Sequence, residues 1–146
     1  MGKKRIVKKG GEGETGGAGS SSRSGTKVGR RKMDTGRLYV EATYNNTKLS
    51  LADTAGNVVV WSSSGSLGFA GAKKGTPFAA AKVGELVGDK AASMGVKEVA
   101  VTVSGVGAGR ESSIRAFATK GIHISSIKDT TPVPHNGPRP PKARRV

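Results

Sequence analysis

Apolar and polar residues alternate over two neighbouring stretches of the first half of the chain. Residues 37–44 place four side chains on one face: Leu38, Val40, Ala42 and Tyr44. The same spacing continues from residue 47 to residue 53 with Thr47, Leu49 and Leu51. A period of two residues is typical of a strand with one buried face. Between the stretches, Asn45 and Asn46 tolerate positive φ, so they predict a tight hairpin turn.

A third strand is predicted at residues 58–61. A turn at residues 54–57 precedes it, and its four residues are all apolar. An uninterrupted apolar run indicates burial on both faces, so we expect this strand to be central or covered by helices. Three strands joined by short turns predict an antiparallel meander.

A helix is predicted after the Ser/Gly-rich loop of residues 62–75. Thr76 supplies a hydroxyl N-cap and Pro77 suits the first helical position, whereas Gly95 marks the end. The apolar stripe repeats at helical spacing through Ala80, Val83, Val87, Ala91 and Met94. Gly84 and Gly88 each cost helix propensity, so their i, i+4 spacing predicts the close approach of another backbone.

The remaining pattern adds a strand at 96–103, a helix at 110–120 and a last strand from 122. Three residues of the second helix are expected to face the core: Ile114, Phe117 and Ala118. In the last strand, Ser125 and Ser126 interrupt the alternation and predict a bulge. The order is βββαβαβ. Strand–helix–strand crossovers imply parallel pairing, so we expect a single α/β domain with a mixed sheet and helices packed on it.

Charge divides the 146 residues into three segments. The chain has 25 Lys and Arg against 10 Asp and Glu, a net charge of +15. Residues 1–36 hold ten basic and three acidic residues, residues 37–129 eleven and seven, and residues 130–146 four and none. We interpret the first as a disordered basic Gly/Ser-rich arm, the second as the folded α/β domain and the third as an extended Pro-rich basic tail. Such a charge favours a polyanionic partner.

Several other classes of protein do not fit this composition. Without cysteine there is no disulfide, thiolate nucleophile or Cys-ligated zinc, and two histidines offer little for a metal site. The basic start lacks the apolar region of a secretory signal, and the apolar stretch at 99–109 is too short to span a membrane. We therefore expect a cytoplasmic polyanion binder with no cofactor, no membrane association and no small-molecule substrate.

A glycine-rich segment enters the second predicted helix at residues 104–113. Gly107 and Gly109 precede the helix N-terminus, where free N–H groups and the helix dipole favour phosphate. Arg110 adds a charge in the first turn, and Arg115 follows one turn later. The spacing matches neither a Walker loop nor a dinucleotide fingerprint. A tight turn without a ligand is the alternative.

Three further segments carry candidate RNA-binding residues. Lys73 and Lys74 precede the first helix, and the amides of Asn45 and Asn46 can reach phosphate or base edges. The proline-stiffened tail offers His135, Asn136, Arg139, Lys142, Arg144 and Arg145. Solvated surface lysines and a plain hairpin turn are the alternatives for the first two. Asn136 also precedes Gly137, so it is a candidate for deamidation to isoaspartate.

Many of these motifs occur together in one known family. They include Tyr44-Asn-Asn-Thr47, Thr76-Pro-Phe-Ala-Ala80, Gly107-Ala-Gly-Arg-Glu-Ser112 and Asp129-x-Thr-Pro-x-Pro-His-Asn-Gly-x-Arg-Pro-Pro-Lys142. Over residues 37–146 the chain resembles the family of small-subunit ribosomal protein eleven, in its bacterial form. The resemblance implies a ribonuclease-H-like α/β fold without nuclease activity. It departs from the family at Lys73, where Arg is usual, and at Ser104-Gly-Val-Gly, where Lys-Gly-Pro-Gly is common.

The family resemblance also implies partners. It places the chain on the platform of the small subunit, bound to small-subunit (16S) rRNA beside the messenger-RNA exit (Shine–Dalgarno) cleft. Its implied neighbours are small-subunit proteins seven and eighteen, with messenger RNA and initiation factor three nearby. On this interpretation the protein is a structural constituent and not an enzyme.

Two other functions remain as alternatives from the residues themselves. A metal-dependent nuclease needs clustered carboxylates on adjacent strands, and Glu41, Asp53 and Asp129 lie on strands or strand ends whose placement the sequence does not give. A membrane-surface protein needs an amphipathic helix with a large apolar face or a lipid site, and neither is evident.

Overall fold

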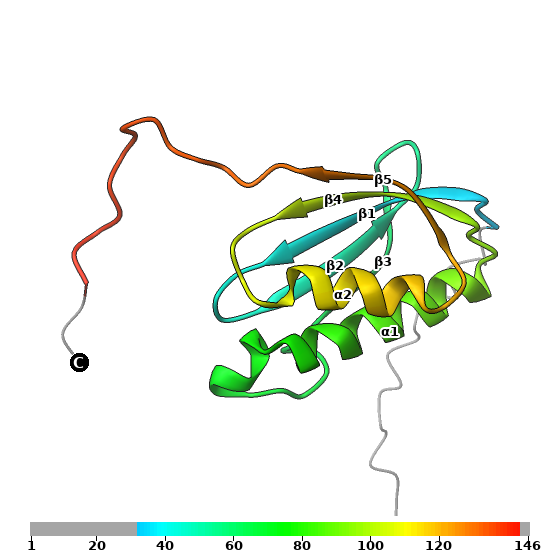
Figure 1. Cartoon of the computed structure of the whole chain (residues 1–146), viewed down its shortest axis with the longest axis horizontal. Coiled ribbons are helices and arrows are strands. Elements are labelled where there is room, and N and C mark those ends of the chain that lie inside the picture. Colours follow the sequence, from blue (N-terminus) through cyan, green and yellow to red (C-terminus); the bar gives the residue numbers. More distant parts are fainter. Residues whose placement is uncertain (1–31, 144–146) are drawn as a thin grey trace, which may run out of the picture.

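Five strands form one mixed sheet in the order β3-β2-β1-β4-β5 in the computed structural model, which describes residues 32–143 (Figure 1). β1 pairs antiparallel with β2 and β2 with β3, whereas β1–β4 and β4–β5 are parallel. The elements are β1 (Thr35–Ala42), β2 (Thr47–Ala52), β3 (Val58–Ser63), the 3-10 helix η1 (Gly71–Gly75), α1 (Pro77–Ser93), β4 (Glu98–Ser104), α2 (Gly109–Ala118) and β5 (His123–Asp129). The predicted α/β class, the meander and the parallel crossovers are confirmed.

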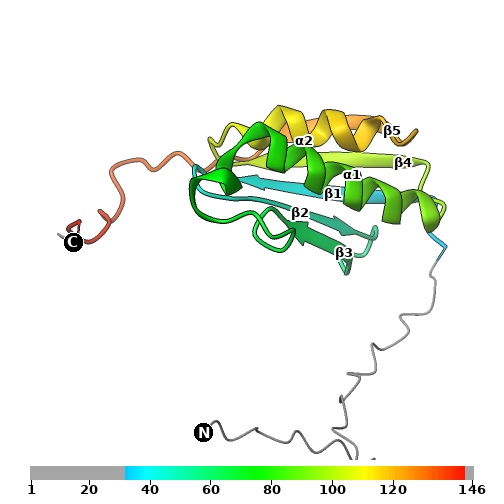
Figure 2. The same ribbon diagram turned by 90° about the horizontal axis from the view of Figure 1, so that it is seen from below.

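Both helices lie on the same face of the sheet, α1 towards β2 and β3 and α2 beside α1 (Figure 2). The inward positions of the strands meet them in one hydrophobic core. Its fully buried members include Leu38, Val40, Leu49, Leu51, Val83, Val87, Val99 and Phe117. Neither helix covers the opposite face, which we call the open face.

Gly84 and Gly88 lie where α1 packs against α2, as their spacing predicts. A Cβ at Gly84 would overlap the backbone carbonyl oxygen of Ser113. A Cβ at Gly88 would instead come within 2.7 Å of Cγ of Lys120, which belongs to a flexible side chain. Backbone contact between the two helices therefore depends on Gly84 more than on Gly88.

Replacing Gly84 by alanine should lower the free energy of unfolding by about 2 kcal/mol, because overpacking outweighs the helix propensity that alanine adds. Gly88→Ala is the matched control. It should stay within about 1 kcal/mol of the unaltered protein, because the Lys120 side chain can move aside while the propensity gain is the same. Urea denaturation of both variants measures the difference, and equal stabilities would contradict the assigned contact.

The prediction that β3 is central is wrong, whereas the alternative, cover by a helix, is confirmed for one of its faces, on which α1 packs. β3 is an edge strand, and Val58 and Trp61 are 56% and 59% exposed. Val60 packs against the core from the side that α1 covers. A bulge opposite Leu51 and Ala52 shifts the register, so that Val58 and Trp61 both lie on the open face. Within the described residues β3 pairs only with β2, so one of its edges has no neighbouring strand. An apolar run alone does not reveal this.

Two expectations at the first hairpin are also wrong. Tyr44 is 79% exposed, because β1 already ends at Ala42 and the chain turns before this side chain can face the core. Asn45 and Asn46 do not adopt positive φ; among the described non-glycine residues only Asn136 does. The tight hairpin itself is confirmed, because Ala42 pairs with Thr47 and the Thr43 N–H donates to the carbonyl of Asn46 at 2.9 Å.

The other elements follow the sequence closely. Thr76 caps α1, with Oγ1 accepting from the N–H of Ala79 at 3.3 Å, and Gly95 ends it with φ of 83°. In β5 the predicted bulge is confirmed, because Val99 pairs with Ile124 and the next residue of β4 pairs with Ser126. The bounds of β1, β4 and α2 differ from the predicted ones by one or two residues, and residues 62–75 contain the end of β3 and η1.

Candidate nucleic-acid interface

The N-termini of both helices and the start of the C-terminal tail lie at one edge of the sheet (Figure 1). β1, β4 and β5 are parallel, so their carboxyl ends share this edge. The hairpin loop of residues 43–46 lies there as well. We call this region the basic edge and define it by Asn45, Asn46, Lys73, Lys74, Gly107, Gly109 and Arg110. The topology thus brings together candidate residues that lie up to 65 positions apart in the sequence.

The glycine-rich loop before α2 packs directly against the end of β1. The N–H of Gly107 donates to the carbonyl of Ala42 at 2.8 Å. A Cβ at Gly105 would overlap that carbonyl, and a Cβ at Gly107 would overlap the carbonyl of Thr43. Both glycines are therefore required by close backbone approach. Gly109 is buried against the side chains of Thr47 and Ala80, so its role is also packing.

The hairpin loop is held from its other side by the segment before α1. A Cβ at Gly75 would overlap the carbonyl of Tyr44. The buried hydroxyl of Ser64 lies 2.5 Å from Oδ1 of Asn46 and 2.8 Å from the carbonyl of Lys74. Asn46 thus uses its amide oxygen inside the chain and positions the turn that carries the lysines. Nothing in the Ser-rich loop sequence singled out Ser64.

Lys73 and Lys74 stand on η1, immediately before α1. Their turn is fixed by Thr76, whose Oγ1 donates to the carbonyl of Lys73 at 2.7 Å. The side chain of Lys73 is exposed and that of Lys74 is partly buried. Within residues 32–143 no carboxylate forms an ion pair with either lysine. Both positive charges are therefore available to an external anion.

Arg110 is engaged within the chain, which the sequence did not indicate. Its guanidinium donates to the carbonyl of Gly105, to Oγ1 of Thr131 at 3.1 Å and to the carboxylate of Asp129. The N–H of Gly105 also donates to Oγ1 of Thr131 at 3.2 Å. We call this set of contacts the tail latch. It joins the glycine-rich loop to the first residues of the tail, so Arg110 fixes the point where the tail leaves the domain.

The tail latch lowers the pKa of Asp129 to about 2, below its ordinary value of 3.8. The main cause is the hydrogen bond from the Thr131 hydroxyl, followed by the backbone N–H of Thr131 and by Arg110. Because these donors favour the charged carboxylate, they stabilise the folded state only while Asp129 is ionised.

We expect the stabilisation by Asp129 to be complete above pH 3.8 and to disappear as the pH falls through about 2. Asp129→Asn keeps the shape of the side chain but removes this titration. Unfolding free energies of the two proteins, measured across the acid range, should therefore differ above pH 3.8 and converge at the lowest pH. A constant difference at every pH would contradict the latch.

The other candidate side chains lie away from the tail latch. Arg115 is exposed on α2 and pairs with Glu111. In the described part of the tail, which has neither helix nor strand, four candidates are exposed: His135, Asn136, Arg139 and Lys142. Arg144 and Arg145 lie outside the described residues. The basic edge therefore gathers the lysines and Arg110, whereas Arg115 and the tail extend beyond it.

Asn136 is exposed, has a φ of 55° and precedes Gly137. A following glycine leaves the backbone nitrogen free to attack the side-chain amide, so deamidation to isoaspartate stays a prediction. Ageing the protein at mildly alkaline pH should produce an isoaspartyl peptide that contains residue 136. Gly137→Val should suppress it, and a clean peptide map of the unaltered protein would contradict the prediction.

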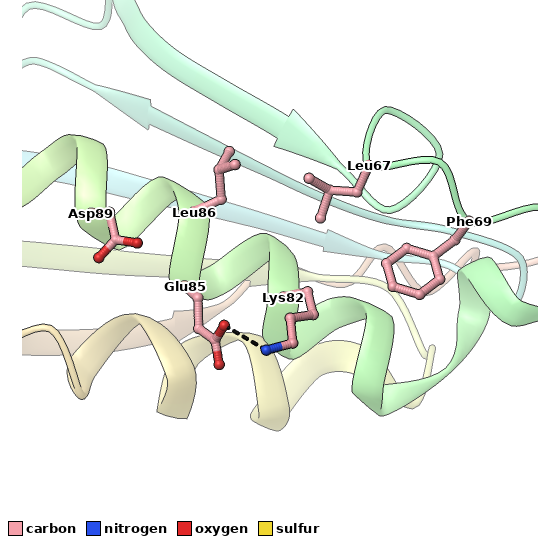
Figure 3. A pocket seen from close by; sticks show the side chains of 6 residues that line it. All are labelled: Leu67, Phe69, Lys82, Glu85, Leu86 and Asp89. Carbon is pink, nitrogen blue, oxygen red and sulfur yellow. Dashed lines mark hydrogen bonds and ion pairs between the residues drawn. The ribbon is translucent and has the colours of Figure 1, made fainter.

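A groove of about 410 Å³ lies outside the basic edge, between α1 and the loop that follows β3 (Figure 3). Its lining combines apolar and charged side chains: Leu67, Phe69, Lys82, Glu85, Leu86 and Asp89. Lys82 pairs with Glu85 at 2.9 Å, and Lys120 pairs with Asp89 at 2.9 Å. The two carboxylates offset the lysines, so this groove lacks the excess positive charge that phosphate requires.

The described residues do not support the nuclease alternative. Residues 32–143 contain no group of three or more His, Cys, Asp or Glu that could hold a metal ion. Asp53 follows β2 at the edge opposite the carboxyl ends of β1 and β5, and Asp129 is bonded to Arg110. Neither helix within residues 32–143 has the length and the apolar composition needed to cross a membrane.

Known proteins match this chain over most of its length. The family model described as ribosomal protein S11 matches residues 36–145. The small ribosomal subunit protein uS11 of Solibacter usitatus is 52% identical over 120 residues, 82% of this chain and 89% of the relative. The uS11 protein of Rippkaea orientalis is 48% identical over 126 residues, 86% of this chain and 97% of the relative. The chain therefore belongs to the ribosomal protein S11 family, which is structural and not enzymatic.

Proposed function

We propose that this protein is a structural constituent of the small ribosomal subunit that binds its 16S rRNA through the basic edge and the C-terminal tail. The relatives are named as small ribosomal subunit proteins. The observation that carries the proposal is the convergence at one edge of two helix N-termini, the origin of a basic tail and two lysines that form no ion pair within residues 32–143.

Phosphate recognition at this edge has two components. Lys73 and Lys74 supply positive charges beside the N-terminus of α1, which the Thr76 side chain already caps. The N-terminus of α2 has no side-chain cap, and free N–H groups at a helix N-terminus favour a phosphate oxygen. Contacts of both kinds read the RNA backbone and its shape, not base sequence.

The tail adds the contacts that reach furthest from the domain. Prolines keep it extended, which lowers the entropy lost on binding. Arg139 and Lys142 are exposed along it and can contact phosphates, and Arg139 can also stack on bases. Arg144 and Arg145 continue the same positive charge in the sequence.

The position within the subunit is also part of the proposal. By its family resemblance we place the protein on the platform, next to proteins seven and eighteen. There it helps to shape the messenger-RNA exit cleft, near messenger RNA and initiation factor three. This placement is tested by assembling the protein with platform rRNA and the neighbouring proteins, and then cross-linking from residues of the basic edge. Cross-links to a different region of the subunit would contradict it.

Binding to fragments of platform rRNA, measured across a range of salt concentrations, tests the RNA interface. Each phosphate contact should contribute roughly −0.7 to −0.9 to the slope of log K against log salt. Replacing Lys73 and Lys74 together by glutamine should therefore make this negative slope shallower by about 1.5. Lys97→Gln is the control, because Lys97 precedes β4 at the opposite edge and pairs with Asp34. Binding that is absent or independent of salt would refute the proposed function.

A further inference from the structure

The open face of the sheet carries two aromatic side chains in one row. The strand registers align five residues across it, from the edge strand β3 to the edge strand β5: Trp61, Ser50, Tyr39, Thr102 and Lys128. Trp61 is 59% exposed and Tyr39 is partly exposed. One strand separates them, so their backbones lie roughly 10 Å apart. Each ring can therefore take a separate planar partner.

Trp61 borders a shallow hollow of about 370 Å³ on this face. Val58, Lys48 and Ser50 complete its lining. The bulge in β3 is what turns Val58 to the same side as Trp61. The hollow thus combines an aromatic ring and an apolar wall with a cation and a hydroxyl group. A nucleobase beside its phosphate presents the complementary groups, namely a π-face, polar edges and a negative charge.

Charge on the open face favours a polyanion near the aromatic row. Three exposed cations lie in or next to the row, on three different strands: Arg37, Lys48 and Lys128. Glu41 is the carboxylate nearest to them in the register, and Lys48 pairs with it at 3.5 Å. Glu98 and His123 lie at the far end, where β4 and β5 begin.

We propose that the open face is a second RNA-binding surface, on which unpaired bases stack against Trp61 and Tyr39 while Lys48, Arg37 and Lys128 contact phosphates. This inference rests on the proposed function and adds a ligand class, single-stranded or loop RNA, that the basic edge does not specify. Ser50 lies between the two rings and Thr102 lies beyond Tyr39, and both are small hydroxylated residues. The core of a protein–protein interface is depleted of charged residues, whereas Arg37, Lys48 and Lys128 lie around these rings.

The tryptophan fluorescence of this protein comes from Trp61 alone, because it is the only tryptophan in the chain. Titrating the full-length protein with a short single-stranded oligouridine should quench its fluorescence, since a stacked base contacts the indole directly. An abasic oligonucleotide of equal length and an RNA duplex keep the phosphates but offer no unpaired base. Both should bind with little quenching. Equal quenching by all three RNAs would overturn the proposal.

Variants of Trp61 test the contribution of stacking to affinity, with labelled RNA as the probe. Trp61→Ala should weaken binding of the single strand about tenfold and leave the duplex nearly unaffected, whereas Trp61→Phe should retain most of the affinity. Ile127→Ala is the matched control. Ile127 is 62% exposed and pairs with the buried Val101, so it lies on the helix side of the sheet. Thermal unfolding checks that all variants remain folded.

The outcomes separate this inference from the proposed function. If the protein binds RNA with the expected salt dependence but Trp61 is not quenched and Trp61→Ala binds normally, only the open-face proposal fails. If no RNA binds, both fail. In assembled subunits, a photoreactive aromatic residue at position 61 should cross-link to RNA. Cross-linking to a ribosomal protein alone would assign the open face to a protein partner and overturn the proposal.

Discussion

Replacing Phe117 by alanine should lower the free energy of unfolding by about 3–5 kcal/mol. Phe117 projects from α2 into the core, is fully buried and is the largest of the fully buried side chains within the described residues. Its removal leaves a cavity between α2, α1 and the sheet, and the close contact at Gly84 limits how far the helices can move to fill it. A domain stabilised by 5–15 kcal/mol loses much of its stability in this way.

Urea denaturation of the full-length chain at fixed salt measures this effect. Phe78→Ala is the control, because Phe78 is 64% exposed on α1. Its ring packs edge to face against that of Phe69, with 6.1 Å between the ring centroids. Its loss should cost no more than about 1.5 kcal/mol. Similar losses for the two variants would mean that Phe117 does not hold the helix pair on the sheet.

Ending the chain after Pro134 should make the negative slope of log K against log salt for rRNA binding shallower by about three. The shortened chain lacks four cations: Arg139, Lys142, Arg144 and Arg145. It keeps the tail latch, and it also keeps the 2.8 Å bond from the N–H of Thr130 to the carbonyl of Val103. The folded domain should therefore unfold as before, so that the change in slope reports on the tail alone.

A tail in which each arginine is replaced by lysine is the matched control for the truncation. It preserves the charge and should preserve the slope, while any loss of affinity at fixed salt measures what the planar guanidinium adds. An unchanged slope in the truncated chain would show that the tail does not contact phosphates in the complex.

The sequence predicted those parts of the fold that depend on local period and capping. Alternation around Leu38 and Leu49 placed two strands and their buried faces. Thr76 and Gly95 marked the ends of α1, and the spacing of Gly84 anticipated the contact with α2. In each case the determining signal lies within one turn of helix or one strand face, so neighbouring residues suffice.

Features that depend on distant partners could not be predicted in this way. An apolar run such as residues 58–61 looks the same in an edge strand and in a central strand, because only the pairing of the whole sheet decides which it is. The basic edge shows the same limit. Arg110 was identified as a cation at a helix start, but its bonds to Asp129 and Thr131 span about 20 residues and join segments with no shared periodicity.

The tail latch also determines how the two RNA-binding elements of the proposed function act together. It fixes the tail at Thr131, and an extended proline-rich chain advances about 3.1 Å per residue, so Arg139 stays within about 25 Å of the basic edge. Once the basic edge is bound, the tail searches only this small volume, at a high effective concentration. Contacts that are weak individually then add up to a tight complex. Each contact can also move from one RNA phosphate to another while the remaining contacts keep the protein bound.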